Sequence, residues 1–157
     1  MSNLLVFPIL FLKSPGALAV LRNIVLDRAG DLNVNNLSPA QLEVICHEYL
    51  RMKGLLKALL LPIGRNLQDI DIWGIGNDGH SVLAQVTHAS QQNQVGTKLE
   101  KLKGFNGQNA TLIFFGPQSG FRADNDVQYI SIESVFVDLC SSQNVAYSRM
   151  VDVMLHR

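Results

Sequence analysis

The stretch DIDIWGIGNDGHSVLAQVT, residues 69–87, decides the fold of this 157-residue chain. Its opening residues alternate between polar and apolar, and residues 81–87 form a second run rich in β-forming residues. Both patterns are typical of strands. The intervening Asn77-Asp78-Gly79 suits a tight turn, because glycine adopts positive φ readily. The stretch therefore predicts a β-hairpin.

Helices and further strands are predicted on both sides of this hairpin. Ser38-Pro39-Ala40-Gln41 forms a capping box with proline at the first helical position. A helix is therefore expected from residue 39, with Gly54 as its stop. The run ATLIFF at residues 110–115 is typical of a central strand buried on both faces. The other expected elements are a loop at 91–96, a helix at 97–105, a strand at 127–132, and helices at 133–142 and 144–156. This order predicts an α/β domain with a mixed sheet.

Composition and charge limit the function classes. The chain is 47% hydrophobic, and thirteen Lys and Arg balance thirteen Asp and Glu. A zero net charge excludes a uniformly basic nucleic-acid binder. The charge is nevertheless uneven, since residues 69–95 carry three aspartates and no Lys or Arg, whereas residues 96–122 carry four Lys and Arg and one glutamate. A local basic patch can therefore lie beside an acidic pocket.

A cytoplasmic protein with no membrane segment is expected. The two cysteines, Cys46 and Cys140, lie in apolar stretches, which indicates buried thiols in a reducing compartment. The apolar run at residues 4–12 is far shorter than the ~20 residues of a bilayer span. No small-molecule cofactor is expected either. Although Gly74, Gly76 and Gly79 match GxGxxG, a dinucleotide site needs a helix after the glycines, and a β-rich run follows them here.

Polar residues with metal-binding chemistry lie on the hairpin. Asp69 and Asp71 are two residues apart and are expected on one strand face, as are Gln85 and Thr87 on the returning strand. Buried carboxylates need a metal, another cation or water. The Asp71 carboxylate and the Gln85 carbonyl are hard oxygen ligands of the kind that Mg²⁺ or Mn²⁺ takes. The alternative is a solvated hairpin edge on which all four are surface residues.

With its capped helix, hairpin, lysine-bearing helix and buried strand, the chain resembles the PD-(D/E)xK nucleases, and most closely their Mrr-like restriction-endonuclease branch. Asp71 matches the family's strand aspartate, and Gln85-Val86-Thr87 matches the D/E/Q-x-K triplet. Glu43 matches the glutamate of the preceding helix. The resemblance implies a restriction-endonuclease-like three-layer α/β/α fold. It also implies a single domain over residues 1–157, with a helical extension at 1–37, a nuclease-like core at 38–135 and C-terminal helices at 136–157.

Thr87 departs from the family pattern. The family lysine at this position positions the attacking water and stabilises charge at phosphorus, and a neutral hydroxyl cannot supply that electrostatic contribution. Either activity is lost, or another cation takes the role of the lysine. Lys98 and Lys101 on the following helix are candidates, because the lysine migrates to a helix in some members of this fold family. The alternative is that both lie on a solvated helix face.

The resemblance implies Mg²⁺-dependent phosphodiester hydrolysis with DNA as the partner. Catalytic roles fall on Asp71, Gln85, Thr87, Glu43 and Lys98, and metal ligation falls on Asp71, Gln85 and the backbone carbonyl of Val86. The expected phosphate contacts are Arg65, Lys98, Lys101 and Lys103. Two alternatives remain open. One is a catalytically inactive domain that serves as a DNA-binding or assembly module, as a homodimer, and the other is a small-molecule enzyme on an unrelated α/β fold.

Overall fold

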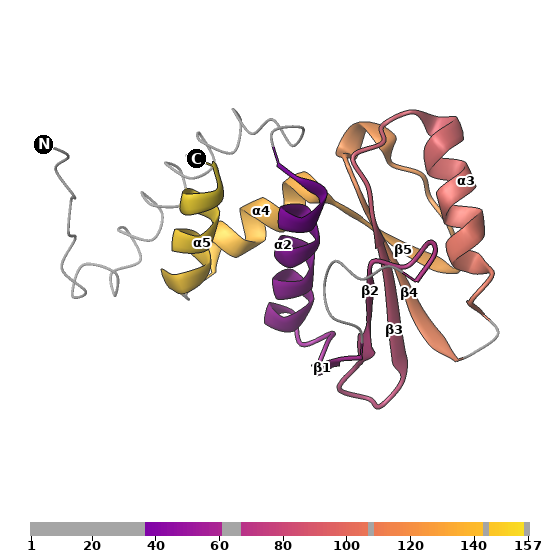
Figure 1. Cartoon of the computed structure of the whole chain (residues 1–157), viewed down its shortest axis with the longest axis horizontal. Coiled ribbons are helices and arrows are strands. Elements are labelled where there is room, and N and C mark those ends of the chain that lie inside the picture. Colours follow the sequence, from indigo (N-terminus) through magenta and orange to yellow (C-terminus); the bar gives the residue numbers. More distant parts are fainter. Residues whose placement is uncertain (1–36, 61–66, 107–108, 143–144, 156–157) are drawn as a thin grey trace, which may run out of the picture.

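The computed structural model describes residues 37–60, 67–106, 109–142 and 145–155 (Figure 1). The predicted N-terminal extension, residues 1–37, therefore lies outside the described residues except for Leu37. In chain order the elements are α2 (Pro39–Met52), β1 (Ala58–Leu59), β2 (Ile72–Ile75), β3 (Ser81–Val86), α3 (Gln92–Lys103), β4 (Ala110–Gly116), the 3-10 turn η4 (Gln118–Gly120), β5 (Val127–Ser131), α4 (Ile132–Ser141) and α5 (Val145–Leu155). No helix within these ranges is long and apolar enough to cross a bilayer.

Helix α2 begins and ends as its sequence predicts. The Ser38 hydroxyl accepts a hydrogen bond from the Gln41 N–H at 3.3 Å, and the Gln41 side-chain oxygen accepts one from the Ser38 N–H at 2.9 Å. This capping box satisfies two N–H groups that have no partner inside the helix. Gly54, just beyond the helix, has φ 69°, a conformation that glycine adopts without steric cost. The capping box and the stop are both confirmed.

The five strands form one sheet in the order β1-β2-β3-β4-β5. The pairings of β1 with β2 and of β2 with β3 are antiparallel, whereas β3 with β4 and β4 with β5 are parallel. Gly79 has φ 83° in the hairpin turn. The α/β class, the hairpin and the mixed sheet are therefore confirmed, and β4 is a central strand as predicted.

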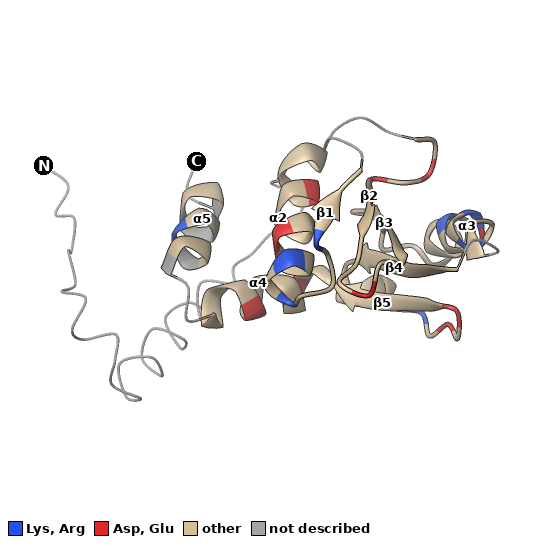
Figure 2. Ribbon diagram, turned by 90° about the horizontal axis from the view of Figure 1, so that it is seen from below, with Lys and Arg blue, Asp and Glu red and all other residues tan. Residues whose placement is uncertain are grey.

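Helices pack against both faces of the sheet (Figures 1 and 2). Helices α2 and α4 share a buried cluster with Ile113 and Phe115 of β4. Helix α3 shares a second cluster with Leu112 and Phe114 of the same strand. Because successive side chains of a strand point to opposite faces, β4 contributes equally to both cores. The sheet thus holds α2 on one side of the hairpin and α3 on the other.

Helix α3 begins at Gln92, so the loop predicted for residues 91–96 is wrong. Val95, Leu99 and Leu102 are all buried in the cluster on this face of the sheet. Their spacing of four and three residues places them on one helical face. The burial of Val95 extends the helix through a segment in which Asn93 and Gly96 disfavour helix locally.

The packing predicts the cost of removing the Phe115 ring. Phe115 is fully buried and makes an edge-to-face contact with Tyr49 of α2, with ring centroids 6.1 Å apart. We expect Phe115→Ala to lower the free energy of unfolding by about 3–5 kcal/mol, because the truncation leaves a cavity. The matched control is Phe121→Ala, whose ring is 50% exposed and which should cost about 1 kcal/mol or less. Urea unfolding measures both, and equal costs would contradict this packing.

Candidate functional site

The Asp71 carboxylate lies at the open end of the hairpin. Its Oδ2 accepts a hydrogen bond from the Val86 N–H at 2.7 Å, and the Asp71 N–H donates to the Ala84 carbonyl at 2.9 Å. The last pair of the β2–β3 ladder is Ile72 with Ala84, so Asp71 lies just before β2 and not on the strand as predicted. The Val86 hydrogen bond places its carboxylate beside the middle residue of the triplet Gln85-Val86-Thr87.

Gln85 holds an unpaired acceptor in this region. The residue is 6% exposed, and its side-chain oxygen Oε1 is buried without a hydrogen-bond donor among the described residues. A buried acceptor left unpaired costs about 1–3 kcal/mol. Amide and carboxylate oxygens are both ligands that a hard cation takes. The unpaired Oε1 makes Gln85 a candidate cation ligand.

Lys98 reaches Thr87, the last residue of the triplet. Its Nζ donates to the Thr87 hydroxyl at 2.9 Å, from the second turn of α3. Thr87 is buried, and its hydroxyl oxygen also accepts from the Ala89 N–H at 3.1 Å. Lys98 is near enough to Asp71 to act on that residue's titration. The structure thus brings Asp71, Gln85, Thr87 and Lys98 together.

Burial dominates the electrostatics of Asp71. Burial raises the pKa of the carboxyl group. The hydrogen bond from Val86 and the Lys98 ammonium lower that pKa in part, whereas the Asp69 carboxylate raises it further. The result is a pKa above the ordinary value. A group in this state is stabilised by any added positive charge.

Helix α2 brings Glu43 toward the same region. The pKa of the buried Cys46 thiol is raised well above its ordinary value, first by burial and then by the carboxylates of Asp71 and Glu43. Both carboxylates therefore act on one thiol of α2. Glu43 is itself buried, at 8% exposure. Cys46 was predicted as a buried thiol, and its position between two acidic side chains could not be predicted from the sequence.

Asp69 does not share a strand face with Asp71, so that prediction is wrong. An isolated bridge joins Leu67 to Ile70, and Asp69 has φ 73° in the turn between them. Strand β2 begins only at Ile72, after this turn. The Asp69 carboxylate instead forms an ion pair with the Lys101 ammonium at 2.9 Å.

The remaining predicted cations do not gather around Asp71. Lys101 is held by Asp69, and Lys103 forms ion pairs with Asp124 at 2.9 Å and with Glu100 at 3.5 Å. Arg65 lies outside the described residues. Of the lysines predicted to contact phosphate, Lys98 is the one that the structure joins to Thr87.

His47 is buried. Its place on the polar side of α2, four residues after Glu43, predicts an exposed histidine, but the side chain is only 7% exposed. This burial lowers the pKa of the ring, with a smaller opposing effect from Glu48. Glu43 and His47 are therefore both buried, which the pattern of α2 alone does not indicate.

A conventional metal cluster is absent from the part of the chain that the structure describes. No three His, Cys, Asp or Glu side chains come together there closely enough to hold an ion. Such a count leaves out amide and backbone oxygens, which are equally good ligands for Mg²⁺. The residues able to hold a cation are Asp71 and Gln85, with the Val86 carbonyl next to them along the chain.

Comparison of the chain with protein-family models, curated proteins and solved structures finds no match in any of the three. The functional assignment therefore rests on the geometry around Asp71, Gln85, Thr87 and Lys98.

The raised pKa of Asp71 predicts a pH-dependent gain in stability for Asp71→Asn. Ionised Asp71 costs stability at neutral pH, and the cost disappears as the pH falls through the folded pKa toward the unfolded value of about 3.9. We expect Asp71→Asn to melt above the wild type at pH 7 in EDTA, with the gap closing near pH 4. The control Asp126→Asn replaces an exposed carboxylate and should show no such gap. A lower melting temperature for Asp71→Asn at pH 7 would contradict this account.

Proposed function

We propose that the protein is a nucleic-acid-directed hydrolase of restriction-endonuclease type, in which Lys98 replaces the missing lysine of the triplet. The observation that carries the proposal is the 2.9 Å hydrogen bond from the Lys98 Nζ to the Thr87 hydroxyl, beside the buried Asp71. A cation held at this point supplies the charge stabilisation that Thr87 alone cannot provide.

Asp71 and Gln85 fit a bound Mg²⁺ or Mn²⁺. The Val86 N–H occupies Oδ2 of Asp71, while the Gln85 Oε1 has no donor among the residues described. The backbone carbonyl of Val86 is the third proposed ligand. When bound, such an ion polarises a phosphate and lowers the pKa of a coordinated water.

Thr87, Lys98 and Glu43 have the remaining roles in the proposed site. Thr87 orients the Lys98 ammonium by accepting its hydrogen bond. The ammonium then opposes the negative charge that develops on the phosphate oxygens. Glu43 of α2 is the proposed holder of a water or a second cation, because it matches the helix glutamate of the nuclease pattern.

DNA is the proposed substrate, held by few cations. Lys residues lie along α3 (Figure 2), but Lys101 and Lys103 are already engaged by carboxylates. The partly exposed pair of Lys101 with Asp69 is weak and exchanges readily for a phosphate. Binding is therefore expected to be weak and to fall steeply with salt.

The second candidate function is a catalytically inactive domain that binds DNA or assembles with another protein, as a homodimer. The observation that favours it is Thr87 itself, because a triplet without lysine is the expected result of lost catalysis. The two functions differ in one property. The hydrolase needs metal for turnover, whereas the inactive module binds its partner and leaves the phosphodiester intact.

Metal binding tests the donor set directly. We expect Mn²⁺ titrated into the purified protein to give a calorimetric binding signal that is lost in Asp71→Ala. Gln85→Leu should weaken the signal about tenfold or more, since an amide oxygen ligand is removed. The matched control is Asp126→Ala, at an exposed carboxylate outside the site. Binding that is unchanged in both Asp71→Ala and Gln85→Leu would place the ion elsewhere.

Plasmid nicking tests catalysis. Nicking should require Mg²⁺ or Mn²⁺ and should fall about 10²–10³-fold in Lys98→Ala, the range found when one preorganised charge-stabilising donor is removed. The double variant Thr87→Lys, Lys98→Ala should recover part of the rate, because it restores a cation at the same point. Lys57→Ala, an exposed lysine beside β1, is the control. A wild type that binds DNA and metal but never nicks would identify the inactive module.

A further inference from the structure

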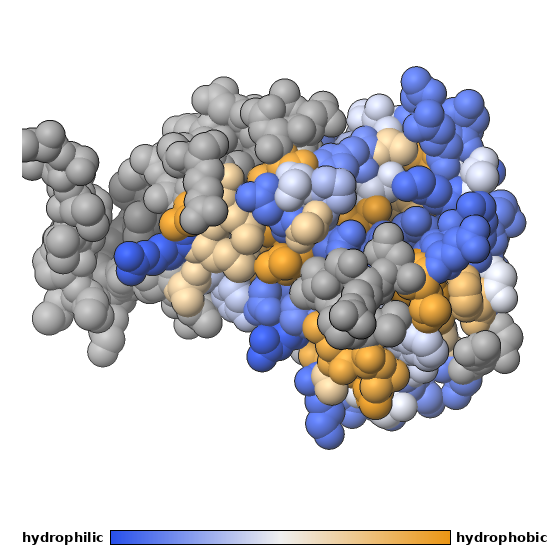
Figure 3. Space-filling view, viewed as in Figure 1, coloured by the Kyte–Doolittle hydropathy of each residue, from blue (hydrophilic) through white to orange (hydrophobic). Residues whose placement is uncertain are grey.

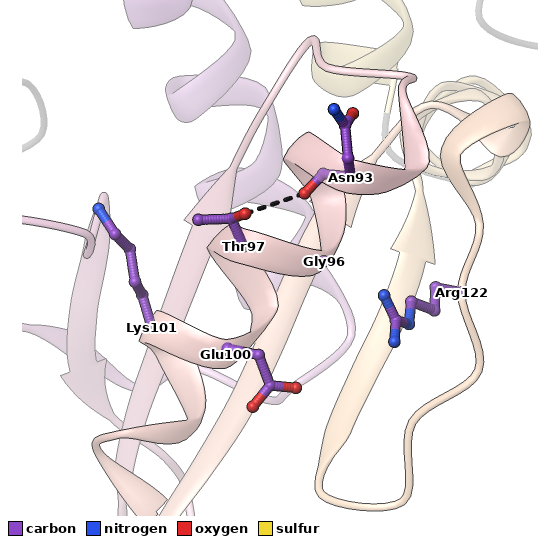
Figure 4. A pocket seen from close by; sticks show the side chains of 6 residues that line it. All are labelled: Asn93, Gly96, Thr97, Glu100, Lys101 and Arg122. Carbon is purple, nitrogen blue, oxygen red and sulfur yellow. Dashed lines mark hydrogen bonds between the residues drawn. The ribbon is translucent and has the colours of Figure 1, made fainter.

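A surface depression lies on the outward face of α3 (Figure 4). Its lining residues are Asn93, Gly96, Thr97, Glu100, Lys101 and Arg122. The surface over α3 is mostly hydrophilic (Figure 3). The depression is separate from Asp71 and Gln85 but close to Lys98, because Lys101 follows Lys98 by three residues, or about 4.5 Å along a helix axis.

Gly96 makes room for the Arg122 guanidinium. The glycine lies inside the twelve-residue helix α3, where it costs roughly 0.5–1 kcal/mol relative to alanine. A Cβ atom at this position would lie 2.5 Å from the Arg122 Nη1, which is too close for real contacts. The glycine therefore lets the guanidinium lie directly against the helix backbone.

Arg122 carries its charge without a carboxylate partner among the residues that the structure describes, unlike Lys101 and Lys103. Glu100, the acidic residue of the depression, is itself paired with Lys103 at 3.5 Å. The depression therefore presents Arg122 and Lys101 against one partly neutralised carboxylate.

The segment that carries Arg122 is fixed by its neighbours. The Gln92 Nε2 donates to the Phe121 carbonyl at 3.3 Å. The Phe121 ring packs edge-to-face on Tyr129, with centroids 5.3 Å apart. These contacts join the residue before Arg122 to the start of α3 and to β5, so the backbone that carries the guanidinium is held in place.

We propose that this depression is a second phosphate subsite, which contacts the nucleic-acid phosphate next to the one at Lys98. The inference rests on the proposed function and extends it to the binding of the flanking strand. Arg122 offers a fork of N–H donors suited to phosphate oxygens. Asn93 adds its side-chain NH₂, since its side-chain oxygen already accepts the Gln94 N–H at 2.8 Å.

Fluorescence anisotropy with a labelled DNA oligonucleotide, single-stranded and as its duplex, tests the subsite in EDTA over a range of salt concentrations. We expect Arg122→Ala to weaken binding about tenfold and to reduce the salt slope by about 0.7–0.9, the contribution of one phosphate contact. Arg149→Ala, which removes an exposed arginine on α5, has the same change of charge and should alter neither quantity.

Gly96→Ala tests whether the position of the Arg122 guanidinium matters, because this variant leaves the charge unchanged. The methyl group displaces the flexible end of Arg122 while adding helix propensity, so we expect weaker binding with an unchanged or higher melting temperature. If the wild type binds DNA and Arg122→Ala behaves like Arg149→Ala, the subsite is wrong and the proposed hydrolase stands. If the wild type binds neither form of DNA, both proposals fail.

Discussion

The hydrogen bond from the Val86 N–H to the Asp71 carboxylate, at 2.7 Å, fixes the end of the hairpin on which the candidate site depends. It continues the contacts between β2 and β3 one step beyond the last paired residues. A carboxylate acceptor makes this bond stronger than a neutral one. It holds Asp71 against Val86, the middle residue of the triplet, while β4 holds Gln85 and Thr87 on the other side.

The sheet determines what surrounds this carboxylate. The parallel strands β3, β4 and β5 run in one direction, so Val86, Gly116 and Ser131 end at the same edge. Ligands of α/β sheets bind at this carboxyl edge. Lys98 of α3 and Cys46 of α2 both interact electrostatically with Asp71, although their helices pack on opposite faces. Lys98 offsets the charge of Asp71, whereas Asp71 on the side of α2 disfavours ionisation of the Cys46 thiol.

Local signals account for the parts of the fold that the sequence predicts. The capping box fixes α2, the Asn77-Asp78-Gly79 turn fixes the hairpin, and the unbroken apolar run fixes β4. The errors occur where tertiary contacts override local preference. Val95 extends α3 through a polar segment because it is buried, and Asp69 turns away because the chain forms a tight turn before β2.

The candidate site, like the fold, could be predicted from the sequence only in part. The hairpin is predictable from strand alternation, although Asp71 and Thr87 lie just outside β2 and β3, and Lys98 and Lys101 emerge as equal candidates from their spacing. Only the packing of α3 distinguishes the two lysines, because it directs Lys98 to Thr87 and Lys101 to Asp69. Arg122 escapes the sequence analysis altogether. Its signal is Gly96, a glycine inside a helix that the guanidinium approaches closely.

The most direct test of the central claim is an anomalous-diffraction measurement on crystals of the protein grown with Mn²⁺. The metal site proposed here predicts a peak within coordination distance of the Asp71 carboxylate and the Gln85 Oε1, with the Lys98 ammonium still bound to the Thr87 hydroxyl. A well-ordered site with no peak, and with the Gln85 Oε1 bonded to a protein donor, would contradict it.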